Sequence, residues 1–317
     1  MVDLAISEAL LESLRCPECG SRLAEHASTL VCDQAHAFPI VHGIPRLVPS
    51  ESLDAGQTRT AAAFGYSWSH YPKQNPYTEA QWRDWIVPLS ETDLQGKVVL
   101  DAGCGLAGFA EYARAWGAAR VVGADLSEAV DAARERLGDA VELVQADLYS
   151  LPFAPGTFDL AYSIGVLHHL PDPEGGFRSL VRTVRAGGLV FAWVYGRENN
   201  GLIVRVFDPL RRLVFSRLPR AVLKWVVALP LAGLLWPVVK ASTRIPIPYG
   251  AYFRFLAKRD FSFTHGVVFD QLVAPTTHYL RREEFEAWFE RAGLIEVTIT
   301  WRNQNSWRGL GRVPISR

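Results

Sequence analysis

The residues whose spacing most clearly predicts chemistry are an aspartate and two glycines in the segment KVVLDAGCGLAGF, residues 97–109. The apolar residues 98–100 predict a strand, and a helix is expected to follow the glycines. Gly103 and Gly105 permit a tight turn whose backbone approaches a ligand, because glycine lacks a Cβ and tolerates positive φ. A strand, a glycine turn and a helix in this order bind nucleotide-type cofactors. Asp101 adds an acid where a dinucleotide site usually has an apolar or neutral residue.

Two further acids follow apolar runs at the spacing that such a site requires. Asp125 ends the run VVGAD about twenty residues after Gly105, where a carboxylate that binds a ribose is expected. An alternative role for Asp125 is to cap the next helix, but Ser127 is better placed for that. Asp147 follows the third apolar run, in the segment QADL.

The D-x-G-x-G form resembles motif I of class I S-adenosylmethionine (SAM) methyltransferases. The later segment FDLAYSIGVLHHLPDP resembles the ubiquinone-biosynthesis and related small-molecule methyltransferases. The resemblance implies that the glycine loop receives the methionine half of SAM, that Asp101 organises its amino group, and that Asp125 binds the ribose. It also implies that Asp147 and the backbone of Leu148 contact the adenine. The full predicted cofactor set is Asp101, Gly103, Gly105, Asp125, Leu126, Asp147 and Leu148.

The same segment carries the adjacent histidines His168 and His169. Imidazole titrates near neutral pH, so His168 is the candidate general base that removes a proton from an acceptor hydroxyl. The alternative is that the pair packs at the start of a helix. Asp159 is expected to support the sheet instead of the chemistry.

Three of the four cysteines and one histidine form the pattern C-x2-C-x12-C-x3-H: Cys16, Cys19, Cys32 and His36. The Cys-x2-Cys pair and the Cys-x3-His pair together can close a tetrahedral Zn²⁺ site. Such a site is structural because four protein ligands leave no open position. With its FPIVHGIP tail, the segment resembles the zinc ribbon of tRNA-methyltransferase activators and of rRNA guanine-N1 methyltransferases. The ribbon either stabilises the N-terminus or docks a protein partner. Clustered cysteines without a secretory signal predict a cytoplasmic protein, with a peripheral position at a membrane as the alternative.

The elements that must position these residues alternate between strand and helix from 97 to 195, with one helix expected over 174–186. This alternation predicts a parallel sheet whose ligands lie at the carboxyl ends of the strands. The predicted fold is α/β: a Rossmann-like, seven-stranded class I methyltransferase sheet with an N-terminal zinc ribbon and a helical insertion. The expected units are a ribbon (1–50), a helical lid or linker (51–95), the SAM-binding core (96–197), the insertion (198–275) and a C-terminal helix with strands (276–317).

The linker and the C-terminal unit offer candidate contacts to the acceptor. Tyr66 and Trp68 are candidate lid residues over the SAM pocket, with packing on the core as the alternative. Beyond the insertion, polar side chains are expected near the acceptor at His278, Tyr279, Arg302, Asn303 and Asn305.

The insertion combines a basic first part with the uncharged segment WVVALPLAGLLWPVV, residues 225–239. With Pro230, Gly233 and Pro237 inside it, this segment is expected to be too short and too broken to span a bilayer. Two interpretations stay open: a buried helical hairpin, or an interfacial helix and lid that brings residues 200–245 against a membrane surface.

The sequence thus predicts a SAM-dependent methyltransferase for a small-molecule acceptor, such as a hydroxyl of an apolar or sugar- or lipid-linked substrate. The alternatives are an RNA methyltransferase guided by the ribbon and a non-catalytic SAM-binding partner module. The chain has 33 basic and 33 acidic residues, so its net charge of zero disfavours nucleic acid as a partner.

Overall fold

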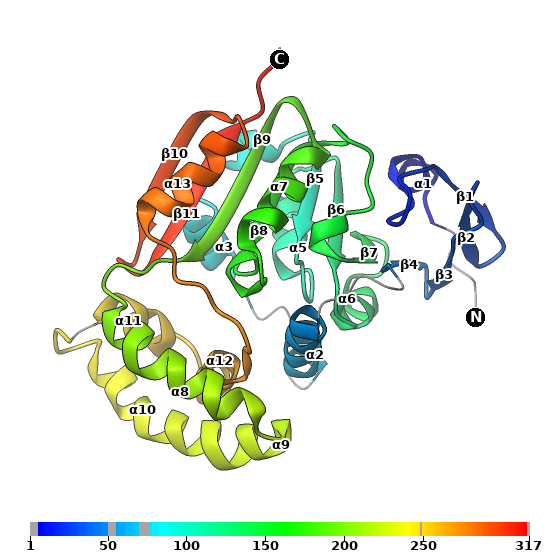
Figure 1. Cartoon of the computed structure of the whole chain (residues 1–317). Helices are drawn as coiled ribbons and strands as arrows, with labels where there is room; N and C mark the ends of the chain where they lie inside the picture. Colours follow the sequence, from blue (N-terminus) through cyan, green and yellow to red (C-terminus); the bar gives the residue numbers. More distant parts are fainter. Residues whose placement is uncertain (1–5, 50–54, 70–76, 248, 316–317) are drawn as a thin grey trace.

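A computed structural model describes residues 6–49, 55–69, 77–247 and 249–315 (Figure 1). Its centre is a twisted sheet in the order β7-β6-β5-β8-β9-β11-β10, in which β11 alone runs against its neighbours. The strands are β5 (Val98–Ala102), β6 (Arg120–Asp125), β7 (Glu142–Ala146), β8 (Phe158–Ile164), β9 (Val184–Tyr195), β10 (Ile295–Arg302) and β11 (Ser306–Arg312). The predicted seven-stranded α/β core is therefore confirmed.

Helices cover both faces of this sheet. The helices are α5 (Gly108–Ala115), α6 (Ala129–Leu137), α7 (Pro173–Thr183) and α13 (Arg282–Arg291). The apolar faces of α7 and α13 share one buried cluster with the sheet, and those of α5 and α6 share the other. The helix expected over 174–186 ends earlier, at Thr183, because β9 begins at Val184. Asp159 supports the sheet as expected, since it accepts hydrogen bonds from the Val98 N–H (2.7 Å) and from Arg185 (2.6 Å).

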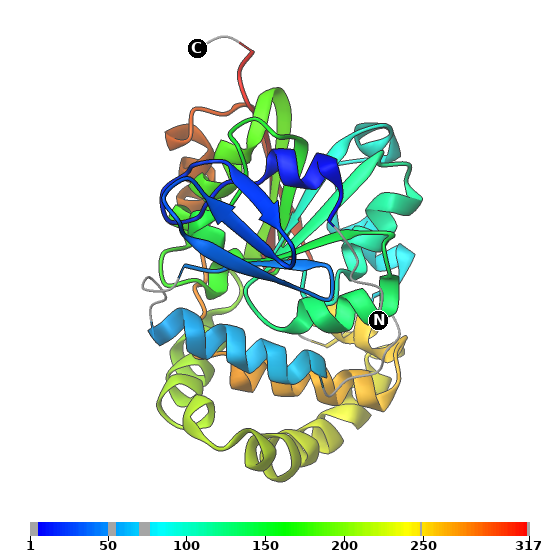
Figure 2. The ribbon, with the colours of Figure 1, turned by 90° about the vertical axis from the view of Figure 1, so that its right-hand side faces the viewer.

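The N-terminal ribbon is joined to the sheet itself. It consists of α1 (Glu8–Ser13), β1 (Leu23–His26), β2 (Thr29–Cys32), β3 (Ala37–Val41) and β4 (Ile44–Leu47). β4 pairs in parallel with β7, so that the ribbon extends the sheet to eleven strands (Figure 2). An ion pair of 2.5 Å between Arg46 and Asp131 of α6 holds this junction.

The linker forms three helices, α2 (Ala55–Ser69), α3 (Glu79–Trp85) and α4 (Glu91–Leu94). α2 lies across the carboxyl edge of the sheet and packs on α6. Gly65 lies at this contact, where a Cβ would reach van der Waals distance of the Ser127 side chain at 3.4 Å.

The insertion forms a helical layer below the carboxyl edge of the sheet (Figures 1 and 2). Its elements are the π-helical turn η3 (Ile203–Phe207), α8 (Asp208–Leu213), the short turn η4 (Phe215–Arg217), α9 (Arg220–Val222), the π-helical turn η5 (Leu223–Ala228), α10 (Leu229–Ala241), α11 (Gly250–Ala257) and α12 (Phe261–Val273). α10 packs against α11 and α12, and α12 contacts α2.

The expectation that prolines break the apolar segment is wrong. α9, η5 and α10 form one helix, Arg220–Ala241, of 22 residues, in which the most apolar 18-residue window has a mean hydropathy of 1.9. Each π-helical turn ends just before a proline, η3 before Pro209 and η5 before Pro230. Proline lacks the N–H for the usual i→i−4 bond, and a π-helical turn lets the helix continue with shifted bonding. Within the described residues this helix is long and apolar enough to cross a membrane.

Candidate functional site

A cavity of about 1030 Å³ lies at the carboxyl ends of β5, β6, β7 and β8. Its floor consists of the loops that follow these strands, and one wall is formed by α2 and α3. The insertion supplies the roof through η3, α10, α11 and α12. The cavity therefore lies where ligands bind in parallel sheets.

The glycine loop forms one end of this floor. Gly103 has φ of +81°, and a Cβ built there would lie 2.5 Å from Cγ2 of Val166. The N–H groups of Gly103 and Cys104 both point to the Ala124 carbonyl, at 2.7 and 3.1 Å. This loop thus crosses from β5 to the end of β6 by a path that only glycine permits at position 103.

Asp125 lies on the cavity and organises the loop. Its Oδ2 accepts from the Gly105 N–H at 2.8 Å, while its Oδ1 accepts from the Ser127 N–H (2.8 Å) and hydroxyl (2.6 Å). Three of about four acceptor positions of the carboxylate are thereby used. A ligand diol that binds both oxygens would have to displace the Ser127 hydroxyl, which can rotate away.

Asp147 lies at the end of β7 and is 3% exposed. Its Oδ1 accepts from the Gln57 side chain of α2 (2.9 Å) and from the Tyr149 N–H (3.1 Å). Burial raises the pKa of this carboxyl. The contact with Gln57 fixes α2 over the site, and sequence reasoning did not anticipate it.

Six of the seven predicted cofactor residues line the cavity: Gly103, Gly105, Asp125, Leu126, Asp147 and Leu148. Asp101 is not on the wall. It lies behind the loop at 2% exposure, and its Oδ2 has no hydrogen-bond partner among the described residues. Burial raises its pKa to about 8. Its contact with a ligand amino group stays a prediction.

The two histidines occupy different environments in the turn η2 (Leu167–His169). His168 is fully buried away from the cavity lining, 4.0 Å from the Tyr195 ring between centroids, and neither ring nitrogen has a partner within the described part of the chain. Burial lowers its pKa far below the usual range. His169, in contrast, lines the cavity. The structure thus places the neighbour of the predicted base, instead of His168 itself, on the cavity wall, because consecutive residues of a turn point in different directions.

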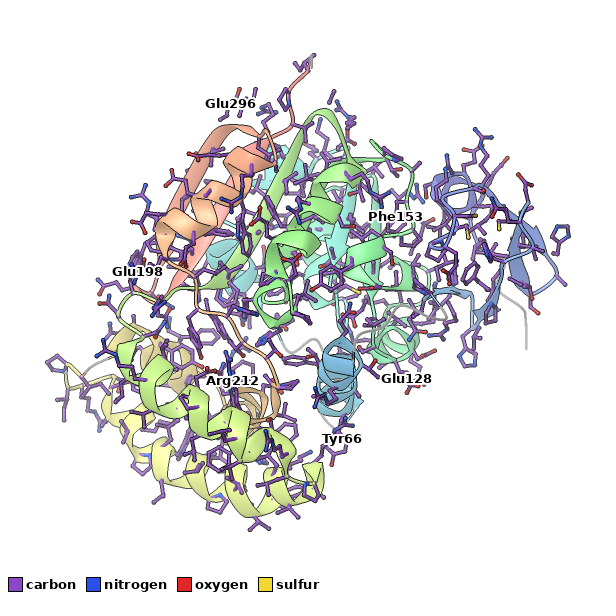
Figure 3. The ribbon with its side chains drawn as sticks, viewed as in Figure 1. Tyr66, Glu128, Phe153, Glu198, Arg212 and Glu296 are labelled. Carbon is purple, nitrogen blue, oxygen red and sulfur yellow. The ribbon has the colours of Figure 1, made fainter. Side chains whose placement is uncertain are left out.

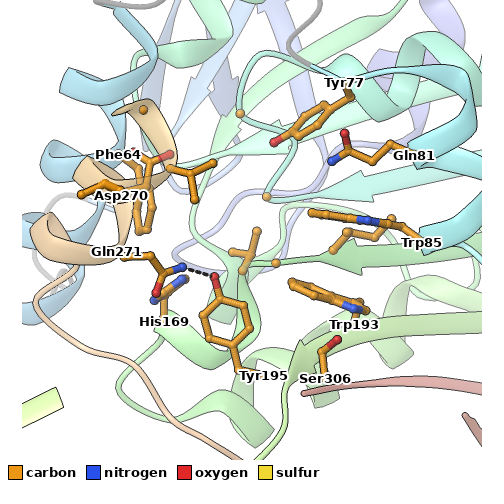
Figure 4. A pocket seen from close by; sticks show the side chains of 18 of the residues that line it. Phe64, Tyr77, Gln81, Trp85, His169, Trp193, Tyr195, Asp270, Gln271 and Ser306 are labelled. Carbon is orange, nitrogen blue, oxygen red and sulfur yellow. Dashed lines mark hydrogen bonds between the residues drawn. The ribbon is translucent and has the colours of Figure 1, made fainter. Parts of the chain in front are cut away.

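The ring of His169 is held in one orientation. Its Nδ1 lies 2.9 Å from the Thr276 carbonyl, which can only accept, so that Nδ1 carries the proton. Nε2 therefore keeps its lone pair. Burial lowers the pKa of His169 to about 4, which makes the ring neutral at physiological pH. Figure 4 shows His169 beside Tyr195 and Gln271, whose amide donates to the Tyr195 hydroxyl at 2.8 Å.

Aromatic side chains make up much of the cavity lining. Trp85 and Trp193 are stacked at 4.8 Å between ring centroids (Figure 4). The Arg302 guanidinium lies 4.7 Å from the Trp85 ring and pairs with Asp84 at 2.6 Å, which ties α3 to β10. The insertion adds further lining residues: Phe207, Leu231, Leu235, Tyr249, Tyr252, Phe253, Phe255 and Phe263.

The predicted lid and acceptor contacts are met in part. Tyr279, Arg302 and Asn305 line the cavity, whereas His278 and Asn303 do not. Tyr66 points to the insertion, with its ring 6.0 Å from that of Phe269 and the Arg220 guanidinium 5.6 Å away (Figure 3). Tyr66 thus packs on the insertion and does not line the cavity, whereas Phe64 of the same helix does. The side chain of Trp68 lies outside the described residues.

Most of the aromatic lining was missed by sequence reasoning. A usable signal existed, since residues 249–263 contain six aromatic side chains, at 249, 252, 253, 255, 261 and 263. Such a density in an insertion, where a soluble helix would show polar faces, indicates a ligand-facing surface.

A second cluster lies in the ribbon. The ligand atoms of Cys16, Cys19, Cys32 and His36 all lie within 4.8 Å of one another. His36 Nδ1 is 3.5 Å from Cys16 Sγ and 3.4 Å from Cys32 Sγ, and the Sγ atoms of Cys19 and Cys32 are 3.7 Å apart. These separations are those of the corners of a tetrahedron with metal–sulfur bonds of about 2.3 Å.

The comparisons with known proteins agree with this geometry. Residues 100–192 match the family model described as a methyltransferase domain. This part of the chain is similar to methyltransferase domains, which confirms the predicted Rossmann-like methyltransferase fold. SAM-dependent methyl transfer by the whole chain stays a prediction. The ribbon lies outside the matched residues, and its likeness to the activator ribbons stays a prediction.

Individual relatives cover parts of the chain. It is 38% identical over 146 residues to the ubiquinone biosynthesis O-methyltransferase of Thiobacillus denitrificans, which covers 44% of this chain and 59% of that protein. It is 33% identical over 107 residues to the sterol 24-C-methyltransferase ERG6B of Gibberella zeae, and this match covers 31% of this chain and 28% of that protein. The structure of an O-methyltransferase family protein from Burkholderia thailandensis aligns at 12% identity and TM-score 0.46, and the alignment covers 74% of this chain and 55% of that one. The chain thus spans at most about three fifths of the length of these proteins.

The glycine loop gives the first prediction. In Gly103→Ala the new Cβ meets Val166 and the residue must keep a positive φ, which costs about 1–3 kcal/mol. We expect the dissociation constant for S-adenosylhomocysteine, measured by calorimetry, to rise at least about tenfold. Gly201→Ala is the matched control, because nothing lies within 4 Å of its Cβ position. Equal affinities of both variants would contradict the assigned role of the loop.

The buried carboxyl of Asp101 gives the second prediction. Its folded-state pKa of about 8 exceeds the ordinary 3.8. The folded protein thus holds a proton that the unfolded chain releases, and the free energy of unfolding falls as pH rises through this window. Asp101→Asn is always neutral. We expect its free energy of unfolding, from urea titrations, to improve relative to wild type as pH is raised from about 4 to about 8, whereas a pH-independent difference would contradict this assignment.

Proposed function

We propose that the protein transfers the methyl group of SAM to a hydroxyl of an apolar small-molecule acceptor. The observation that carries this proposal is the continuity of one cavity. It begins at the glycine loop and the acids Asp125 and Asp147, passes His169, and ends among the aromatic side chains of the insertion. Its volume is at the upper end of the range of about 300–1000 Å³ for single ligands, which leaves room for a cofactor and an acceptor together.

The residues in the part of the cavity beside the glycine loop fit SAM. A loop in which a Cβ would clash can bring its backbone against the methionine part, and two carboxylates at successive strand ends suit a ribose and an adenine amino group. The bound cofactor would supply an electrophilic methyl group on a sulfonium. The protein itself must then align the acceptor, exclude water and accept the acceptor's proton.

His169 is the group in this cavity that is equipped to accept that proton. Its Nδ1 is committed to the Thr276 carbonyl, so its Nε2 is the basic atom. The low pKa of the ring keeps Nε2 free of a proton throughout the neutral range. In this proposal the predicted base, His168, serves as the buried support against which His169 and Tyr195 pack.

The acceptor class follows from the lining. The polar lining residues of the roof are Asn200, Lys258, Arg259, Asp260, Ser262, Asp270 and Gln271. Most side chains of the roof are aromatic or aliphatic, which favours an acceptor with a sizeable apolar part. The relatives named for ubiquinone biosynthesis and for sterols point in the same direction, although the name of a relative does not identify the acceptor of this chain.

The experiment measures S-adenosylhomocysteine formation with a series of phenols that carry alkyl tails of increasing length. We expect His169→Ala to lower kcat about 100-fold or more, with little change in cofactor affinity. The control is His26→Ala, which alters an exposed histidine of the ribbon. Wild-type kcat should stay constant down to about pH 5 and fall toward pH 4, because protonation removes the Nε2 lone pair.

Three results would contradict this proposal. Full turnover by His169→Ala would remove the base, and loss of turnover only in a folded His168→Gln variant would return the role to the neighbour. SAM binding with no turnover of any tailed phenol would favour the non-catalytic alternative.

We further propose that Cys16, Cys19, Cys32 and His36 hold a structural Zn²⁺. The support is the closeness of four ligand atoms of suitable chemistry, within 4.8 Å of one another. The ribbon is small, and its buried apolar side chains, such as Leu30 and Phe38, belong to the cluster of the main core. A bound metal would therefore supply folding free energy to this unit. Because β4 continues the sheet beside β7, this free energy would also hold the edge of the cofactor domain.

The zinc proposal predicts about one Zn²⁺ per chain by atomic emission. Cys19→Ser should lower both the zinc content and the melting temperature, since a lost ligand weakens the metal and the fold together. Cys104→Ser, at the fourth cysteine of the chain, is the control and should retain the metal. Metal-free wild type with an unchanged melting temperature would rule the site out.

A further inference from the structure

The outer face of the helix Arg220–Ala241 is apolar. Only 28% of its most apolar 18-residue window is buried. The exposed side chains include Trp225 (56%), Val226 (66%), Leu234 (75%) and Val238 (43%). The residues that face inward are also mainly apolar, with Leu223, Ala228 and Ala232 fully buried. A surface helix of a soluble domain carries polar residues on its outer face, and this helix does not.

A second segment of the insertion repeats this feature. The exposed large apolar residues of 201–214 are Leu202 (70%), Val206 (58%), Leu210 (44%), Leu213 (63%) and Val214 (43%), which recur with helical spacing. The inward side chains of the same segment, Asp208 and Arg211, are buried and paired with each other. This segment thus buries one ion pair and exposes a row of apolar side chains.

Basic residues accompany these apolar faces. Exposed basic positions of the segment 200–245 are Arg205, Arg212, Arg217, Lys240 and Arg244. Asp208 is the single acid between 199 and 245, and it is neutralised within the segment by Arg211 and by Arg212 at 2.8 Å. An apolar face with basic residues complements an anionic lipid surface, in which side chains enter the acyl boundary and cations meet headgroups.

The helix is anchored to the protein along its inner side. It packs on α11 and α12, and its buried Lys224 lies beneath the outer face, 5.1 Å from the Trp225 ring. An orientation across a bilayer would detach these contacts and place Lys224 in the hydrocarbon core. An orientation in the plane of the interface keeps them.

We propose that the insertion docks the protein on an anionic membrane surface through residues 202–238. Leu231 and Leu235 of the same helix line the cavity, and Leu231 is itself 39% exposed. The membrane-facing helix is therefore also a wall of the cavity, which gives a bilayer-resident acceptor a short path inward. This last step rests on the proposed function, whereas the docking itself does not.

Docking is tested by sedimentation of the full-length protein with sucrose-loaded vesicles, without SAM or acceptor. One set is phosphatidylcholine, and the other contains a one-third share of phosphatidylglycerol. The double variant Val226→Asp/Leu234→Asp should bind the anionic vesicles at least about tenfold more weakly than wild type. Neither residue lines the cavity. The matched control, Val87→Asp/Ile295→Asp, alters similarly exposed apolar residues (39% and 46%) outside the insertion and should bind as wild type does.

The basic residues are tested separately. Arg205→Glu/Arg217→Glu should remove most of the preference for anionic over neutral vesicles, roughly fivefold for each charge, and raised salt should weaken wild-type binding. Circular dichroism and affinity for S-adenosylhomocysteine confirm that each variant is folded.

Three outcomes overturn the docking proposal. They are wild type that sediments with neither vesicle, binding that the double aspartate variant retains, and a concentration-dependent dimer that the same variant abolishes, which would assign the face to a second copy of the chain. Vesicle binding without turnover would instead leave docking intact and count against the proposed reaction.

Discussion

The arrangement of the cavity depends on one buried cation, Arg211. Its guanidinium is 1% exposed and donates to the carboxylate of Asp208 and to the backbone carbonyl of Ala274. A buried charge is costly unless it is paired and its donors are satisfied. Asp208 and Ala274 meet this requirement only if the start of the insertion and the segment that leaves it lie side by side. The cation thus fixes the path of residues 274–280.

That path carries the chemistry of the acceptor end. The Thr276 carbonyl, two residues beyond Ala274, sets the tautomer of His169. The His278 N–H donates to the His168 carbonyl at 2.7 Å, and the Leu280 N–H donates to the Tyr195 carbonyl at 3.0 Å. The insertion and the histidine turn are therefore one hydrogen-bonded unit. In the proposed reaction, a change in the roof would therefore alter the orientation of His169 and couple acceptor specificity to proton removal.

The cofactor half of the site was predictable and the acceptor half was not. Asp125, Asp147 and the glycine loop follow apolar strands in a parallel sheet, and topology alone brings such strand ends together. His168 and His169 differ only in the direction in which their side chains point from one turn. No periodic pattern in the sequence specifies this direction. The pairing of β4 with β7 joins residues about 99 positions apart and leaves no local pattern. The continuous helix through Pro230 depends on a π-helical turn that no pattern in the sequence predicts.

The places where local rules failed are those where the chain departs from an ordinary soluble fold. A helix that is apolar on both sides, with prolines inside it and a lysine beneath it, contradicts the pattern of a water-soluble layer. Local conflicts of this kind are expected at functional surfaces. Here the inner side of the helix lines a cavity and the outer side meets the surroundings of the protein. An acceptor that passes from lipid to the cofactor would require a helix that is apolar on both its inner and its outer face. A sealed pocket in a soluble protein requires only an apolar inner face.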